Sequence, residues 1–425
     1  MDSSDGDHSK LTFAGLFGIA FFWVCGGPYG NEGLVQLGPS GVVFLVYAAS
    51  TVLYSIPIAL INAELAVAIP EDGGLVVWVN KAFGPIVGGY SAWFWLCSVM
   101  FDSAIYPTLA AEYILTGGNI AKDEEGLNRF TVILIAEAVV LGSTCVKLLG
   151  SDIVSKFSTL ATLVSLVPVF VLLAWSIFTV RMRPARWFRW SSIALEPEPE
   201  PEPDWEADVL SAAELQIQAG TGGQAFALTQ VDPADELTFD GVNWGLLISW
   251  CIWLSSGYLG LGSLAAGIDN PKRTYPLLLS ILIPFVMCVY IFPFFVSLSI
   301  TEDMRLYEAG FFVSIATQVA GEWLSSLMLF SACTAMAALY ISVSIMSEVS
   351  MQAMLEEHSP TVRRYANLDG NLSKETRGCK GFCSGPRIRR WLFFHQDGSP
   401  APAYILTNAA VATVLVTFPY REFSS

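Results

Sequence analysis

The first long apolar stretch of this chain is interrupted by a run that a continuous helix would not contain. Apolar residues extend from Leu11 to Val24, and Cys-Gly-Gly-Pro-Tyr-Gly-Asn-Glu follows over residues 25–32. Backbone groups at membrane depth must be satisfied internally, so an unwound segment persists there only where it is buried in protein or lines a cavity. A second interruption, Ser-Ser-Gly-Tyr-Leu-Gly-Leu-Gly over residues 255–262, lies in another apolar stretch. Paired broken helices are typical of the binding sites of secondary transporters; the alternative is a pair of ordinary glycine-rich packing helices.

The composition indicates that these stretches lie in a membrane. Hydrophobic residues make up 53% of the 425 residues and charged residues 14%, with a mean hydropathy of +0.53, which is too apolar for a soluble protein of this length. The N-terminus lacks the basic region of a signal peptide, so we expect the first stretch to be retained. Nine stretches are long enough to cross about 30 Å of hydrocarbon. They cover residues 11–37, 41–67, 86–115, 130–149, 153–180, 243–268, 276–299, 322–350 and 402–418.

The spans predict an all-α integral membrane protein with six segments. These are a cytoplasmic N-terminus (1–10), five spans forming a first repeat (11–180), an acidic Glu-Pro loop (181–242), spans six to eight (243–354), a basic cytoplasmic loop (355–400) and the ninth span with the chain end (401–425). The excess of Lys and Arg on the side of the N-terminus favours this orientation, although four arginines at 181–189 would then lie outside. Because an inverted repeat needs five spans in each half, we expect the chain to be truncated at its C-terminus.

The formal charge of −16 is concentrated in the acidic loop. Residues 196–240 contain 12 Asp or Glu and no Lys or Arg, and residues 196–204 alternate Glu and Pro before ending in Asp. Prolines hold an extended conformation while like charges repel, so this loop is predicted to be a disordered extracellular spacer. The alternative is an antenna that concentrates cations outside the membrane.

The first break provides several candidate substrate contacts. A discontinuous helix leaves unpaired N–H groups at the start of its outer half and unpaired carbonyls at the end of its inner half, which suit a carboxylate and an amine. Gly26, Gly27 and Gly30 let a ligand approach the backbone closely, and Tyr29 lies among them. Glu32 follows, where it either pairs with a cation or titrates, or caps the outer half-helix.

Other candidates lie near the second break and in two further spans. Asp102 is in the middle of the third span, where an ionisable group marks a substrate or proton pathway unless it makes a structural hydrogen bond. Trp253 and Tyr258 are predicted to stack on a substrate amine, or else to pack, and Ser256 lies within the second break. Lys156, early in the fifth span, is either a fixed positive charge or a cytoplasmic anchor. The candidates for proton coupling are Asp102, Glu32 and Lys156.

The sequence contains no pattern that favours an enzyme. It has no phosphate-binding loop, no zinc-protease motif, and three His residues of which none lies in a span. A loose nucleotide-binding pattern at 260–265 lies inside an apolar span and follows no strand, so the required context is missing. We therefore expect no catalytic residues, no metal site, no cofactor and no nucleic-acid partner.

Several motifs, read in order, resemble the amino acid, polyamine and organocation transporter superfamily. They are Gly-Gly-Pro-Tyr-Gly-Asn-Glu at 26–32, Ala-Glu-Leu at 63–65, Pro-Glu-Asp-Gly-Gly at 70–74 with Val-Val-Trp-Val at 76–79, Asp102 with Tyr106-Pro107, and Asp-Asn-Pro-Lys at 269–272. Within the superfamily, the chain most resembles the plant and protozoan branch that takes up polyamines and amino acids. The resemblance implies a leucine-transporter-type fold, with substrate between the broken first and sixth helices and beside the third and eighth. Two positions depart from it, because Leu259 and Ile268 stand where relatives carry acids.

These observations predict a secondary active transporter for polyamines or amino acids. The resemblance implies that a proton gradient drives uptake, and the pattern of broken helices favours alternating access. A neutral or cationic amino-acid permease or exchanger of the same fold is the alternative within this class, and a non-transporting sensor or accessory protein is the alternative outside it. The expected partners are a small-molecule substrate, protons and membrane lipid, in the plasma membrane or an endomembrane.

Overall fold

The computed structural model describes residues 13–69, 71, 73–117, 129–190, 242–268, 270–358 and 402–417. The Glu-Pro repeat and most of the predicted basic loop lie outside these ranges. The expectations that the repeat is extended, disordered and extracellular therefore concern residues outside the described part of the chain.

Within these ranges the protein is all-helical, with no β-strand among the described elements. Each of the nine predicted spans contains a helix, and seven helical stretches are long and apolar enough to cross a membrane. The elements are α1 (Phe13–Val24), η1 (Glu32–Leu37), α2 (Ser40–Ser50), η2 (Thr51–Ser55), α3 (Ile56–Ala68), α4 (Leu75–Gly117), α5 (Arg129–Leu148), α6 (Ser151–Thr179), α7 (Pro184–Trp187), α9 (Trp244–Leu254), η3 (Gly257–Gly267), α10 (Pro271–Ile300), η4 (Met304–Leu306), α11 (Phe311–Ala320), α12 (Glu322–His358) and α15 (Pro402–Thr417). Helix α11 was not among the predicted elements, because ten residues are too few to span a bilayer.

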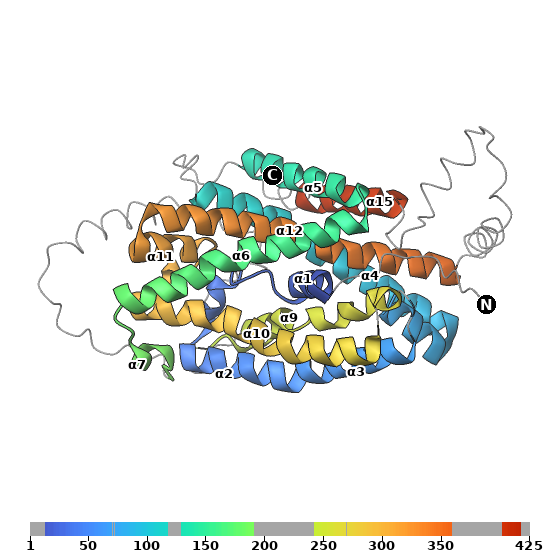
Figure 1. Cartoon of the computed structure of the whole chain (residues 1–425), viewed down its shortest axis with the longest axis horizontal. Coiled ribbons are helices and arrows are strands. Elements are labelled where there is room, and N and C mark those ends of the chain that lie inside the picture. Colours follow the sequence, from blue (N-terminus) through green and yellow to red (C-terminus); the bar gives the residue numbers. More distant parts are fainter. Residues whose placement is uncertain are drawn as a thin grey trace, which may run out of the picture.

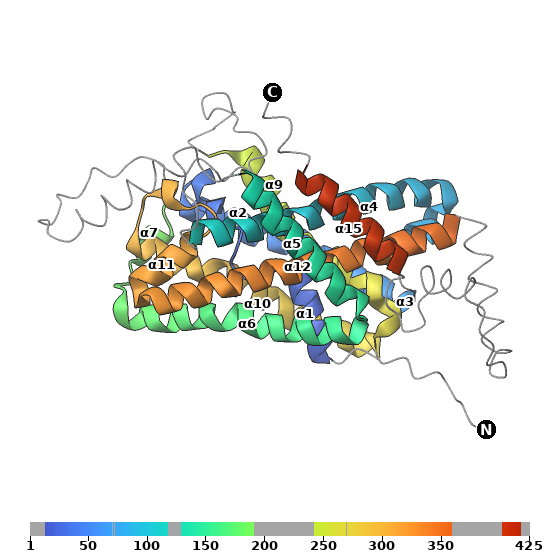
Figure 2. The same ribbon diagram turned by 90° about the horizontal axis from the view of Figure 1, so that it is seen from above.

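Helix α1 lies at the centre of the bundle, with α6, α10, α12 and η3 packed around it (Figure 1). Its side chains from Leu16 to Val24 are buried apart from that of Phe17, as expected for a helix that is apolar on all sides. Helices α4 and α12 pack extensively along each other. Helices α5 and α15 lie against each other on the side of the bundle opposite α2 and α3, and Figure 2 shows α5 crossing α12.

The first break is confirmed. Helix α1 ends at Val24 and residues 25–31 are non-helical. Gly27 and Gly30 have φ angles of +108° and +83°, which residues with a side chain rarely adopt, and Pro28 has no N–H to continue a helix. The chain resumes as η1, a 3-10 helix of six residues that forms the outer half of the broken helix.

The prediction for the second break was right about the interruption and wrong about its form. Helix α9 ends at Leu254, but after Ser255 and Ser256 the chain continues as the 3-10 helix η3. The start of η3 lies against the end of α1, because a Cβ added at Gly257 would lie 1.9 Å from the carbonyl oxygen of Trp23. Glycine is thus required where the two broken helices cross.

Two further distortions have local causes. A turn of π-helix, η2, joins α2 to α3 immediately before Pro57, whose ring cannot be accommodated in a regular helix. Helix α4 is kinked at Gly84, where φ is +83° and ψ is 175°, immediately before Pro85. The long part of α4 therefore begins close to residue 86, where the sequence predicts the third span.

Candidate functional site

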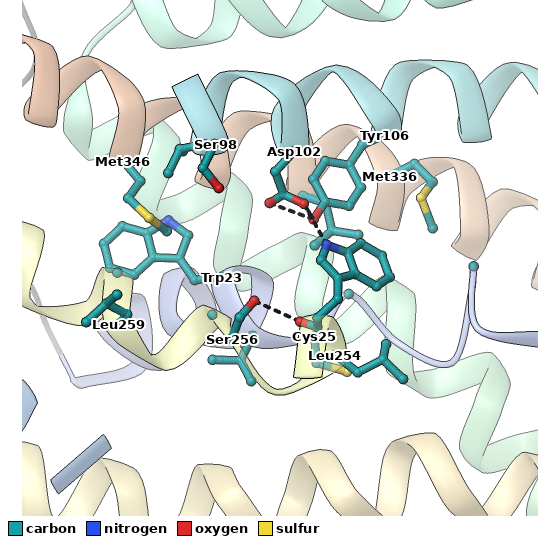
Figure 3. Close-up of a pocket in the computed structure, with 18 of the residues that line it drawn as sticks. Trp23, Cys25, Ser98, Asp102, Tyr106, Leu254, Ser256, Leu259, Met336 and Met346 are labelled. Atoms are coloured by element: carbon teal, nitrogen blue, oxygen red, sulfur yellow. Dashed lines mark hydrogen bonds between the residues drawn. The ribbon is translucent and has the colours of Figure 1, made fainter. Parts of the chain in front are cut away.

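The two breaks, together with α4 and α12, surround a cavity of about 260 Å³ (Figure 3). This is the position that the resemblance implies for a substrate. Six of the nine predicted substrate-binding residues line the cavity: Gly26, Tyr29, Gly30, Asp102, Trp253 and Ser256. Five further aromatic residues line it: Trp23, Tyr54, Trp95, Tyr106 and Tyr290.

Asp102 supplies the one carboxylate among the described residues that line this cavity. Its Oδ1 accepts a hydrogen bond from the indole Nε1–H of Trp253 at 2.9 Å. The Tyr106 hydroxyl, one turn further along α4, donates to Oδ1 and Oδ2 at 3.4 and 3.3 Å (Figure 3). The ion pairs between described residues all involve other carboxylates. Asp102 is thus held by two neutral donors and retains lone pairs for a protonated amine or a proton.

Side chains from α6 and α12 hold the unwound part of the first helix. The Ser165 hydroxyl donates to the carbonyl oxygen of Gly26 at 3.0 Å. The Tyr29 hydroxyl lies 2.7 Å from that of Ser331, which in turn donates to the carbonyl oxygen of Ser165 at 2.8 Å. These bonds replace part of the helical hydrogen bonding that the break removes, as backbone at membrane depth requires.

Glu32 lies outside the cavity and is 1% exposed. Its Oε2 accepts the backbone N–H of Gly30 at 2.8 Å, and its Oε1 accepts the hydroxyl of Tyr113. The Gly30 N–H is also 2.8 Å from the Tyr113 hydroxyl oxygen. Of the two roles left open by the sequence, this geometry favours the capping of the break, with Tyr113 tying it to α4.

Three other predicted residues are not brought to the cavity. Gly27 faces α6, since a Cβ there would lie 3.0 Å from Ser165 Oγ. Tyr258 is 2% exposed and packs in the core, so its ring does not face a substrate amine in this cavity. Lys156 is on the exposed surface of α6. Its position fits the predicted anchor and not a fixed charge within the site.

A buried ion pair was missed by sequence reasoning. Lys147 on α5 is 3% exposed and Glu348 on α12 is fully buried, and Nζ lies 2.6 Å from Oε1. Lys147 also donates to Ser344 Oγ at 2.8 Å, and its Nζ lies 5.1 Å from the centre of the Tyr340 ring. The available signal was Glu348 itself, an acid within the predicted eighth span.

The fold defines a multi-pass membrane protein with a central cavity between two broken helices. Residues 15–422 match the family model described as amino acid permease. The chain therefore belongs to the amino acid permease family of the amino acid, polyamine and organocation superfamily, which confirms the resemblance. It is a member of a family of membrane transporters and not an enzyme.

Similar proteins include plant transporters. Polyamine transporter RMV1 of Arabidopsis thaliana is 26% identical over 394 residues, covering 91% of this chain and 68% of that protein. Polyamine transporter PUT1 of Oryza sativa subsp. japonica is 26% identical over 310 residues, covering 73% of this chain and 48% of that protein. Among solved structures, MhsT in complex with L-phenylalanine aligns with a TM-score of 0.48 at 13% identity, covering 95% of this chain and 88% of that chain.

Proposed function

We propose that this protein is a secondary active transporter that takes up a polyamine or an amino acid by alternating access. A proton gradient drives uptake, and no cofactor takes part. Family membership and the plant relatives, which are named as polyamine transporters, support this assignment. The proposed location is the plasma membrane, with an endomembrane as the alternative.

The single observation that carries the proposal is Asp102 at the cavity wall. A carboxylate at membrane depth is energetically costly unless it faces water, a charged partner, or a substrate or proton pathway. Asp102 faces a cavity, and Trp253 from the second broken helix orients it. A protonated amine is the group shared by polyamines and amino acids, and it is the complement of such a carboxylate. When the substrate is absent, Asp102 can hold the coupling proton, with Glu32 as the second candidate for that role.

The alternative within the class is a neutral or cationic amino-acid permease or exchanger. The cavity favours it in one respect, because Asp102 has no acidic companion among the described lining residues. A non-transporting sensor, the alternative outside the class, would bind a ligand in the cavity without accumulating it in the cell.

Uptake by the full chain in a transport-deficient host tests the proposal. The panel contains labelled putrescine, arginine, leucine and the simple monoamine phenethylamine, at two external pH values and equal surface expression. Accumulation of at least one protonated amine, greater at the lower pH and lost with a protonophore, is expected. If putrescine, arginine and leucine all fail to accumulate above the host background, the assignment to a polyamine or an amino acid is wrong. If phenethylamine fails as well, the transport proposal itself is wrong.

A further inference from the structure

The cavity combines one carboxylate among its described lining residues with a wall that contains several aromatic and aliphatic side chains. Among the described residues that line the cavity, Asp102 is the only carboxylate, and there is no Lys, Arg or His. Seven aromatic residues line the cavity, together with Cys25, Met336, Met346 and several aliphatic side chains. Such a surface suits an apolar or aromatic body, with thioethers and ring edges making favourable contacts.

A second ammonium group would find no countercharge here. Leu259, on the second break, lines the cavity with an apolar side chain and offers no charge to an amine. Glu32, the acid of the first break, does not line the cavity and is buried against the Gly30 N–H and the Tyr113 hydroxyl. Hydroxyl and ring dipoles attract a second ammonium more weakly than a carboxylate does, and a desolvated charge without a partner is strongly disfavoured.

Several backbone amides of the two breaks already donate within the protein, which leaves fewer donors for a substrate carboxylate. In the first break, the amides of Cys25, Gly27 and Gly30 donate within the protein, to Phe21 O, Cys25 Sγ and the Glu32–Tyr113 pair. In the second break, the amides of residues 255, 256 and 259 donate to carbonyl oxygens of residues 252, 253 and 256. The Glu32 carboxylate therefore takes a place that an anionic ligand could use, and Asp102 repels a second anion in the same cavity.

We propose that the cavity selects monocationic amines with an aromatic or apolar body and no carboxylate, in preference to polyamines and amino acids. The ammonium group of the preferred ligand binds Asp102 beside Trp253. The aromatic side chains of the cavity contact the apolar part of the ligand. This inference rests on the transport mechanism of the proposed function, and it replaces the polyamine or amino acid named there with a monocationic amine as the preferred ligand.

Equilibrium binding to the purified full chain in detergent tests the selectivity separately from transport. Ligand-induced thermal stabilisation and competition with labelled phenethylamine are measured for phenethylamine, putrescine and leucine at one pH and ionic strength. Phenethylamine is expected to bind at least about tenfold more tightly than either of the others. Equal or tighter binding of putrescine or leucine would overturn the inference, as would the absence of phenethylamine binding.

A gain of charge at Leu259 provides the matched test. Leu259→Asp places a second carboxylate on the cavity wall, whereas Leu259→Asn adds a polar group of the same size without charge. The Asp variant is expected to tighten putrescine binding about tenfold or more relative to the Asn variant and to weaken phenethylamine binding. Equal putrescine affinities of the two folded variants would contradict the role given to the missing acid. Selective binding of phenethylamine without accumulation in the host would refute the transport proposal and leave the selectivity intact.

Discussion

Replacing Asp102 with Asn removes a charge from the cavity and keeps the shape of the side chain. A hydrogen bond to a charged group is worth about 1.5–3 kcal/mol and a neutral one about 0.5–1.5 kcal/mol. The difference of about 1–2 kcal/mol corresponds to a rise of about 5- to 30-fold in apparent KM for an amine bound at this position. The Asn carbonyl can still accept the Trp253 indole, so folding should change little.

The assay is initial-rate uptake over a range of substrate concentrations, followed by exchange and accumulation at two pH values. If Asp102 holds the substrate amine, affinity falls as stated. If it carries the coupling proton instead, exchange remains and pH-driven accumulation is lost. Glu322→Gln, an exposed acid at the start of α12, is the matched control and should behave as the parent. An Asp102→Asn protein that equals the parent in affinity, pH dependence and accumulation, at equal surface expression, would refute both roles.

Three stability predictions can be checked by thermal melting of purified variants. Lys147→Met leaves Glu348 charged and buried, so the free energy of unfolding is expected to fall by about 3–5 kcal/mol. Adding Glu348→Leu should restore most of this loss. A double variant as unstable as the single one would contradict this account. Gly257→Ala forces apart the two broken helices and should cost about 1–3 kcal/mol or more, whereas Gly142→Ala, with nothing within 4 Å of the new Cβ, should cost nothing. Asn31 is 1% exposed, and neither polar atom of its side chain has a hydrogen-bond partner in the described structure. Asn31→Leu should therefore leave the protein equally stable or stabilise it by about 1–3 kcal/mol. A clear destabilisation would show that the Asn31 side chain makes a hydrogen bond.

The positions of the helices and of the first break could be predicted because their causes are local. Apolar runs of sufficient length predict the membrane spans. The two glycines at positive φ on either side of Pro28 end α1 through local backbone conformation alone. The second break contains no proline, so its backbone can form a 3-10 helix. The amino-acid sequence alone does not distinguish this helix from an irregular segment. The position of Asp102 could also be predicted from the sequence, because an acid in the middle of a membrane span usually faces the bundle interior or a water-filled cavity.

The remaining features of the site depend on helix rotation and on partners far apart in the chain. Glu32 was placed correctly near the break, but its capping role requires Tyr113, 81 residues away. The ion pair of Lys147 was not predicted, because its partner Glu348 lies 201 residues further along the chain. Whether Tyr258 faces the cavity or the core is set by the rotation of η3, which the spacing of residues does not fix.

The central claim is that a transported amine binds at Asp102 between the two broken helices, and a substrate-bound structure of the full chain tests it most directly. Electron cryomicroscopy in the presence of saturating phenethylamine is expected to show ligand density in the cavity lined by Asp102, Trp253 and Tyr106. The amine nitrogen should lie within about 2.7–3.2 Å of a carboxylate oxygen of Asp102. Density for the ligand at another site, with this cavity unoccupied under the same conditions, would contradict the account.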